Sequence, residues 1–296
     1  MPLLFATLGE ILTEKSGSLN LGVEGMMLMG AVFGFSTVYN TGNPFLALCA
    51  AFLAGAVGAF IFALITVTFQ GNQVVTGLTL TIFGAGFSRF VGDHMIGSSV
   101  PRAAQDFFGK VKIPLLGDIP FVGQIFFRQD VFVYLGYIMV AVLSVYIYKT
   151  RPGLNMKAVG ENTAAADASG IPVNLYKYLH IVAGGGLCGL GGAYLGIVSV
   201  PMWQEDVVTG RGWIAVALVI LAGWNPIKAL VGSFVFGALS ILGLWQGSMG
   251  IHISQDIVNM FPYLATILIV IISTHKNRKE DRPPGNLSDP YFREER

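Results

Sequence analysis

The sequence predicts an all-α protein, a polytopic membrane helix bundle with about nine membrane segments. Of its 296 residues, 53% are hydrophobic and 12% are charged, whereas soluble domains carry roughly 25% charged residues. The mean hydropathy is +0.65. So few charged side chains could not cover the surface of a soluble protein of this size, which argues against a soluble enzyme. The net charge of +1 gives no electrostatic reason to expect a nucleic-acid partner.

Some nine apolar stretches, taken in order, come near the roughly 20 residues that a helix needs to cross the hydrocarbon layer. We place them at 2–12, 23–39, 44–69, 74–97, 131–149, 179–201, 212–224, 227–246 and 258–274. The first and the seventh are too short to cross upright and are predicted to be half-helices or re-entrant segments. Residues 1–274 are predicted to form the transmembrane domain. The stretch 275–296 mixes both charges with turn formers, so we expect a flexible cytoplasmic tail.

Lys and Arg residues beside the predicted spans indicate the orientation. They gather at 275–279, in the loop 150–178 and beside the short connection that follows Trp224. If the segments alternate, these three regions and the loop 13–20 share the cytoplasmic side. The N-terminus then lies outside and the C-terminus inside. The opposite loop, 98–130, also carries basic residues.

Glycines recur four residues apart inside the predicted spans, and small residues let helices approach one another closely in lipid. Tight packing is therefore one interpretation of this pattern. The other is a helix that bends or slides during a conformational cycle, because glycine weakens a helix. The sequence leaves both open for the three pairs Gly30/Gly34, Gly185/Gly189 and Gly192/Gly196.

Polar side chains at membrane depth are costly, and they usually face a protein interior or a water-filled cavity. Glu24 is predicted to stand at a helix N-terminus, where the helix dipole favours a carboxylate. Arg89 and Asp93 are four residues apart, which predicts a local ion pair near the outer interface or, alternatively, the mouth of a pathway. We assign Glu10, Asn20 and Glu24 to pinning the wall of that pathway rather than to contact with a solute.

The sequence contains no motif that predicts catalysis, a metal site or a cofactor. A phosphate-binding loop, a Gly-x-Ser-x-Gly turn and a His-Glu-x-x-His pair are all absent from it. We therefore expect that the chain is not an enzyme and does not itself hydrolyse nucleotide. Cys49 and Cys188 lie in apolar runs and are interpreted as core residues.

The loop between the fifth and sixth predicted spans is longer than an ordinary connection needs. Arg151-Pro152-Gly153 ends the span before it, and Asn162 or Thr163 can cap a short alanine-rich helix. We interpret this exposed helix as a docking surface for a partner protein rather than as a plain loop. The predicted contact residues are Gly160, Glu161, Asn162, Ala164, Ala165, Asp167, Ala168, Ser169 and Gly170.

The same loop resembles the cytoplasmic coupling segment of permeases in bacterial binding-protein-dependent ABC importers. That family includes the ribose and branched-chain amino acid permeases. The resemblance covers nearly the whole chain up to Thr274. The stretch 114–121 is similar to the subgroup of nucleoside importers fed by a lipoprotein of the basic membrane protein type. The other matching motifs lie at 8–10, 14–17, 20–27, 160–171, 210–215 and 223–226.

The resemblance implies a multi-pass protein of the bacterial plasma membrane that forms, with a second, paralogous permease subunit, a pathway for uptake of a nucleoside or simple sugar. A separate ATP-binding subunit would drive uptake from the cytoplasmic side. An extracytoplasmic substrate-binding lipoprotein would meet the loop 98–130. The alternative for the phenylalanines of this loop is an aromatic belt at the membrane interface. Membrane lipid is the remaining expected partner, with no nucleic acid and no cofactor. The alternative is a stand-alone secondary transporter or channel for a small polar solute, which the two short segments favour.

Overall fold

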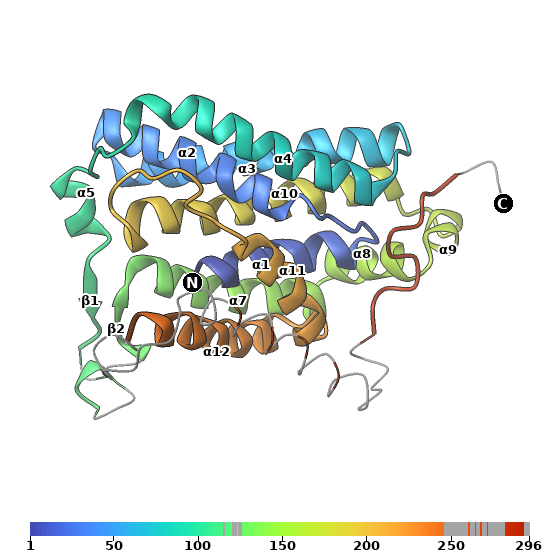
Figure 1. Ribbon diagram of the computed structural model, residues 1–296. Helices are drawn as coiled ribbons and strands as arrows, with labels where there is room; N and C mark the ends of the chain where they lie inside the picture. The colour runs from blue at the N-terminus through green and yellow to red at the C-terminus, as the bar shows by residue number, and fades with distance from the viewer. Residues whose placement is uncertain are drawn as a thin grey trace.

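The computed structural model describes residues 1–114, 116–119, 123, 126–245, 260, 264, 267, 271 and 282–292. Over these residues the long helices lie roughly side by side, and a small hairpin stands at one end of the bundle (Figure 1). The first half of the chain contains α1 (Pro2–Lys15), α2 (Val23–Thr41), α3 (Pro44–Ala63), the π-helical η1 (Leu64–Thr68), α4 (Gln73–Gly92), the 3-10 turn η2 (Asp93–Met95), α5 (Arg102–Phe107), β1 (Lys110–Lys112), η3 (Leu116–Asp118) and β2 (Arg128–Asp130).

The second half continues the bundle with further helices. Its elements are α7 (Val131–Lys149), α8 (Arg151–Glu161), α9 (Thr163–Ala168), α10 (Val173–Tyr194), the π-helical η4 (Leu195–Ser199), α11 (Arg211–Ala222) and α12 (Pro226–Trp245).

The predicted all-α membrane bundle is confirmed in its class. In the described part of the chain, 4 helices are long and apolar enough to cross a membrane, and they span Pro44–Thr68, Gln73–Met95, Val131–Lys149 and Val173–Ser199. With 14 residues in α1 and 12 in α11, these helices are about 21 and 18 Å long, so both are short as predicted. The predicted last span, 258–274, lies outside the described residues except at four isolated positions.

One predicted boundary is wrong: α10 begins at Val173, not at 179. The predicted loop 150–178 therefore includes the first six residues of the helix, 173–178. Lys177 and His180 are instead buried, at 4% and 5% exposed. Tyr146 on α7 pairs with the His180 ring through its hydroxyl at 2.7 Å. The polar residues therefore belong to the packed start of the helix.

The core of the bundle forms around α10, which packs against α1, α2 and α3. In the span formed by α10 and η4, 78% of an 18-residue apolar stretch is buried, compared with 22% of such a stretch in α4 and η2. Glycine makes this packing possible, because a Cβ at Gly192 would overlap the Met27 carbonyl and one at Gly189 would overlap the Ala51 carbonyl. Tight packing, the first of the two interpretations of the glycine pattern, is therefore what the structure shows at these positions.

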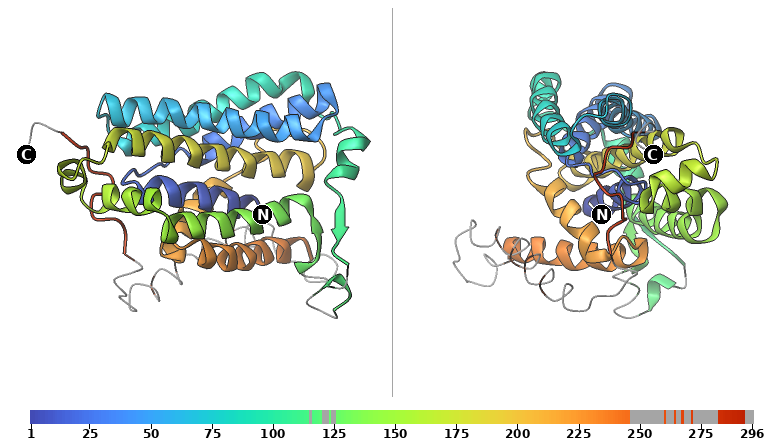
Figure 2. Two further views of the ribbon diagram at one scale, coloured as in Figure 1. Left: turned by 180° about the vertical axis from the view of Figure 1, so that it is seen from behind. Right: turned by 90° about the vertical axis from the view of Figure 1, so that its right-hand side faces the viewer.

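The two ends of the bundle differ in what they carry (Figures 1 and 2). At one end lie α5, β1 and β2. At the other lie α8, α9 and the segment 282–292. The loop 13–20 also reaches this second end, because Gly17 packs on Gly160. Of the regions that the charge pattern grouped on one side, the loops 13–20 and 150–178 thus share one end, whereas 275–279 lies outside the described residues. The described part of the loop 98–130 lies at the other end.

Candidate functional site

The second end of the bundle is built from two short helices rather than from a loop with one helix. Arg151-Pro152-Gly153 does end the preceding span, but it also begins α8, since proline is well tolerated in the first turn of a helix. The Thr150 side chain caps α8 by accepting from the Gly153 N–H. Asn162 caps α9 in the same way, accepting from the Ala165 N–H at 2.9 Å. Of the two predicted candidates, Asn162 is thus the residue that caps α9.

One face of α9 is fastened to the bundle, and the other is open. Ala166 is buried in a small apolar cluster with Val159 of α8 and Val173 of α10. Thr163 is also buried and donates its hydroxyl hydrogen to the Val159 carbonyl at 2.8 Å. Most of the predicted contact residues lie on the open side and are exposed, namely Glu161, Asn162, Ala164, Ala165, Ala168, Ser169 and Gly170, while Asp167 is half-buried.

Gly160 departs from this pattern. It is buried, and a Cβ there would overlap the carbonyl of Lys15. Its own carbonyl accepts a hydrogen bond from the Asn286 N–H at 2.9 Å. Gly160 therefore packs α8 against the end of α1, and it is not available on the exposed face where we placed it.

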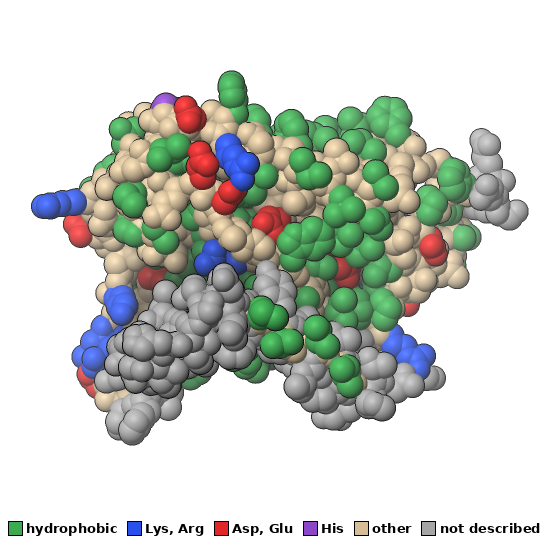
Figure 3. Space-filling view, in the orientation of Figure 1, with side chains coloured by type: hydrophobic (Ala, Val, Ile, Leu, Met, Phe, Trp, Pro, Cys, Tyr) green, Lys and Arg blue, Asp and Glu red, His purple; other side chains and the backbone are tan. Residues whose placement is uncertain are grey.

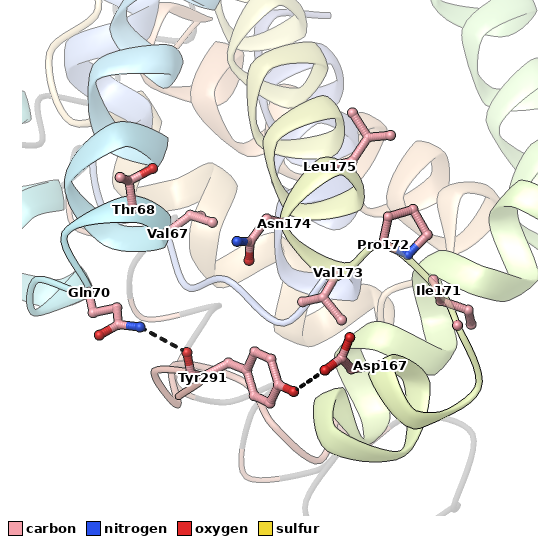
Figure 4. A pocket seen from close by; sticks show the side chains of 11 residues that line it. Val67, Thr68, Gln70, Asp167, Ile171, Pro172, Val173, Asn174, Leu175 and Tyr291 are labelled. Carbon is pink, nitrogen blue, oxygen red and sulfur yellow. Dashed lines mark hydrogen bonds between the residues drawn. The ribbon is translucent and has the colours of Figure 1, made fainter. Parts of the chain in front are cut away.

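A pocket of about 580 Å³ opens beside α9, between the turn that joins η1 to α4 and the connection from α9 to α10. Figure 4 shows Gln70 on one side, Asp167 on the other and Tyr291 between them. The Tyr291 hydroxyl donates to Asp167 Oδ2 at 2.6 Å, and the Gln70 side-chain amide donates to the Tyr291 carbonyl at 3.1 Å. The predicted free tail is thus wrong for 282–292, which is fastened to the bundle.

Buried polar residues of α1 hold this helix to neighbouring elements. Glu10 is fully buried, and its Oε1 accepts from the backbone N–H of Asn20 at 3.0 Å. Asn20 in turn accepts from the Gly22 N–H at 2.9 Å, which shapes the turn into α2. One helical turn further on, Glu14 Oε2 accepts from Trp224 Nε1 at 2.5 Å. These bonds join α1 to the start of α2 and to the end of α11.

Glu24 stands at the N-terminus of α2, as predicted. Its Oε1 accepts from the backbone N–H of Gly210, the residue that precedes α11, at 2.8 Å. A carboxylate placed at two helix N-termini is favoured by both helix dipoles. The close approach requires Gly212, because a Cβ there would overlap Glu24. The geometry agrees with a pinning role for Glu24, which stays a prediction.

Arg89 does not pair with Asp93, so the predicted local ion pair is wrong. Its guanidinium lies 2.5 Å from Asp206, in the loop between η4 and α11. Asp93 lies in the turn η2 after α4, where it is exposed. Positive φ angles at Asp206, Thr209 and Gly210 give the loop the shape that brings Asp206 to Arg89. Both partners are about half exposed, at 54% and 45% of their side chains.

The sequence reasoning missed Glu14, Trp224, Asp206 and Tyr291. Each acts through a contact more than 110 residues away along the chain, and local spacing carries no signal of such contacts. Cys49 was also misjudged, since it is exposed whereas Cys188 is buried. Within the described ranges, no group of three His, Cys, Asp or Glu residues could hold a metal ion.

The opposite end carries the antiparallel hairpin of β1 and β2, in which Lys112 pairs with Arg128. Asp118 binds both, with Oδ1 2.5 Å from Lys112 Nζ and 3.3 Å from Arg128. The neighbouring Lys112 ammonium holds the pKa of Asp118 below its ordinary value, and Arg128 adds to the effect. These charges are exposed and so are placed for contact with water or with a partner protein.

The comparisons with known proteins decide what kind of bundle this is. The family model described as "Branched-chain amino acid transport system / permease component" matches residues 1–272. The chain belongs to this permease family. The family resemblance that the sequence motifs predicted is thereby confirmed, and the chain is a transport subunit rather than an enzyme.

Several of its relatives are named as ABC transporter permeases. The permease is 35% identical to the putative glucose ABC transporter permease protein TsgC13 of Haloferax volcanii, over 99% of this chain and 94% of that protein. It is 32% identical to the guanosine ABC transporter permease protein NupQ of Bacillus subtilis, over 100% and 94%. It is also 32% identical to the nucleoside ABC transporter permease protein NupC of Lactococcus lactis subsp. cremoris, over 92% and 88%. No solved structure matches the chain significantly.

A membrane permease accounts for the surface of the bundle. Hydrophobic side chains are spread over the face in Figure 3. Among the large ones, Phe90 is 83% exposed, Ile82 75% and Leu53 61%. Apolar side chains exposed to this degree on long apolar helices are expected where lipid or another membrane subunit surrounds the protein.

Proposed function

We propose that this permease is one of two paralogous membrane subunits of an ABC importer, with α9 and its neighbours as the docking surface for a separate ATP-binding subunit. Together the two permeases form the pathway for a nucleoside or a simple sugar. The observation that carries the proposal is the open alanine face of α9. This face is small enough to enter a groove, and it is backed by the buried side chains that fasten α9 to α8 and α10.

The mechanical argument follows from how α9 is attached. Ala166 packs on residues of both α8 and α10, and α8 follows α7 after a single residue. A subunit that binds α9 and moves on ATP binding therefore displaces the ends of two long helices. Such displacement shifts the populations of inward-open and outward-open states, which is how alternating access is driven.

The orientation proposed from the charge pattern places the α8–α9 end in the cytoplasm, with the N-terminus outside, the C-terminus inside and about nine membrane segments in total. The loop 98–130 then faces the extracytoplasmic substrate-binding lipoprotein. The exposed charges of Lys112, Asp118 and Arg128 support this, since they suit contact with a soluble protein.

The pathway wall is proposed along α4 and the loop before α11. Charged side chains avoid lipid and face a cavity or another protein, and the exposed Arg89–Asp206 pair lies where these two segments meet. In the isolated chain most of α4 is not buried. This agrees with a helix that faces the second permease subunit across the pathway. The short α1 and α11, which also favoured a stand-alone transporter, then serve as wall elements pinned by Glu10, Asn20 and Glu24.

The test replaces the small residues of the docking face by bulky, charged ones. We expect Ala165→Glu and Ala168→Glu to abolish both copurification with the ATP-binding subunit and uptake of labelled guanosine or glucose, while membrane insertion stays normal. Ala103→Glu, at an exposed alanine of α5 at the opposite end, is the control and should keep copurification. Unchanged uptake in the α9 variants would refute the docking role. Ion-driven flux by the purified chain without ATP would favour the stand-alone transporter instead.

A further inference from the structure

The segment 282–292 crosses the end of the bundle on which α9 lies, as the views in Figures 1 and 2 agree. It is held at several points rather than at one. The backbone N–H of Asn286 donates to the Gly160 carbonyl at 2.9 Å, and that of Gly285 donates to Glu161 Oε2 at 3.2 Å. Pro284 is buried, and Leu287 packs against the main core. Hydrogen bonds and buried apolar side chains thus fix this segment on α8.

Tyr291 then extends the attachment from α9 to a different part of the bundle. Its ring packs in the cluster of Val159, Ala166 and Val173, and its hydroxyl donates to Asp167 on α9. Its carbonyl accepts from the side chain of Gln70, which lies in the turn between η1 and α4. Figure 4 shows Tyr291 lying between these two partners.

This bridge matters because α9 otherwise packs mainly on α8 and α10, whereas α4 packs mainly on α2 and α3. The pocket of about 580 Å³ separates α9 from the turn at Gln70. Tyr291 spans that gap with one hydrogen bond at each side. A displacement of α9 can therefore reach the hairpin of α3 and α4 through Tyr291 as well as through α10.

We propose that the segment 282–292 is a strap and that Tyr291 is its positioning residue, transmitting movement of α9 to the α3–α4 hairpin. The inference rests on the proposed docking of an ATP-binding subunit on α9. Tyr291 does not contact the solute and is not part of the open alanine face. It sets how much of the motion delivered to α9 becomes movement of α4, the helix proposed to line the pathway.

The decisive variant is Tyr291→Phe, which keeps the ring in its cluster and removes only the hydrogen bond to Asp167. In the complete complex in proteoliposomes we expect solute transported per ATP hydrolysed to fall about tenfold or more, the factor that one hydrogen bond to a charged acceptor commonly contributes. ATP-binding subunit copurification should stay intact. Tyr39→Phe, at an exposed tyrosine near the C-terminus of α2, is the matched control and should leave the ratio unchanged.

A double-mutant cycle with Asp167→Ala shows whether the two groups act together. If the strap works through this bond, Tyr291→Phe should lower the transport-to-ATP ratio much less in the Asp167→Ala background than in the wild-type chain. An unchanged transport-to-ATP ratio in Tyr291→Phe would overturn the strap. Loss of copurification in that variant would also overturn it, by making Tyr291 part of the docking surface.

Hydrogen exchange of the purified permease tests the strap even if no ATP-binding subunit docks on α9. Tyr291→Phe should speed amide exchange in α9 and also in residues 68–72 on the far side of the pocket. Faster exchange in α9 alone would show a local contact and would contradict transmission. Failure of the wild-type chain to bind an ATP-binding subunit would refute the proposed function without changing this readout.

Discussion

At the residue scale, the bond between Trp224 and Glu14 shows how a buried acid is stabilised in this permease. Both side chains are almost fully buried, at 3% and 2% exposed, and they are separated by 210 residues along the chain. A buried carboxyl group without a hydrogen-bond donor is costly. The indole N–H therefore stabilises Glu14 and, through it, ties the end of α11 to α1.

This bond gives a prediction for Trp224→Phe, which keeps an aromatic six-membered ring and removes the donor. We expect the free energy of unfolding in detergent to fall by about 1–3 kcal/mol, since a buried acceptor loses its partner. Thermal unfolding of the purified permease measures the change. Trp213→Phe is the control, because that ring is 38% exposed at the start of α11. Equal losses in the two variants would mean that the hydrogen bond contributes nothing specific.

The residue scale is also where sequence reasoning was least informative. It identified Glu10, Asn20 and Glu24 as polar residues to explain, because charges in apolar runs stand out locally. It paired Arg89 with Asp93 because helical spacing was the only available guide. The loop that carries Asp206 folds back to α4 through positive φ angles, and nothing in the spacing of residues predicts that return.

At the element scale, close contact between helix backbones dominates the packing of α10. A Cβ added at Gly192 would overlap the Met27 carbonyl on α2, so the two helices would have to separate. Gly86 on α4 differs, since a Cβ there would meet no atom within 4 Å. The same residue type thus serves tight packing at one position and has no packing requirement at the other.

The contrast predicts opposite effects of alanine at these two sites. Gly192→Ala should lower the free energy of unfolding by about 3 kcal/mol or more, the upper range for overpacking, because backbone atoms are the obstacle. Gly86→Ala should be neutral or stabilising by up to about 1 kcal/mol, since alanine favours a helix over glycine. Unfolding in detergent measures both. A stable Gly192→Ala protein would show that α2 and α10 are less tightly packed than described.

Helix existence was easier to predict than helix boundaries. Long apolar runs predicted α2, α3, α4 and α7 to within a few residues, because crossing lipid demands such runs. Pro152 and Gly153 were taken only as helix breakers, and so α8 was missed, although proline fits the first turn of a helix. The start of α10 was missed because its polar residues are typical of a loop, whereas Lys177 is buried and His180 pairs with Tyr146 of α7, 34 residues away along the chain.

At the scale of the whole molecule, the two ends of the bundle carry different elements, and the charge pattern correctly predicted that the loops 13–20 and 150–178 share an end. Successive membrane spans run in opposite directions. The number of spans before a loop therefore decides on which side of the membrane that loop lies, without knowledge of tertiary contacts. The attachment of 282–292 was not predicted. Its turn-forming composition is typical of a free tail, whereas its hydrogen bonds to Gly160 and Glu161 depend on where α8 lies.

The docking of an ATP-binding subunit on α9 is tested most directly by a photo-crosslinking amino acid placed at position 165 in the intact membrane. The same group at position 106, an exposed residue of α5 at the opposite end, is the control. We expect illumination to join the ATP-binding subunit to the chain from position 165 and not from position 106. A crosslink to that subunit from position 106, or none from position 165 in an actively transporting complex, would contradict the account.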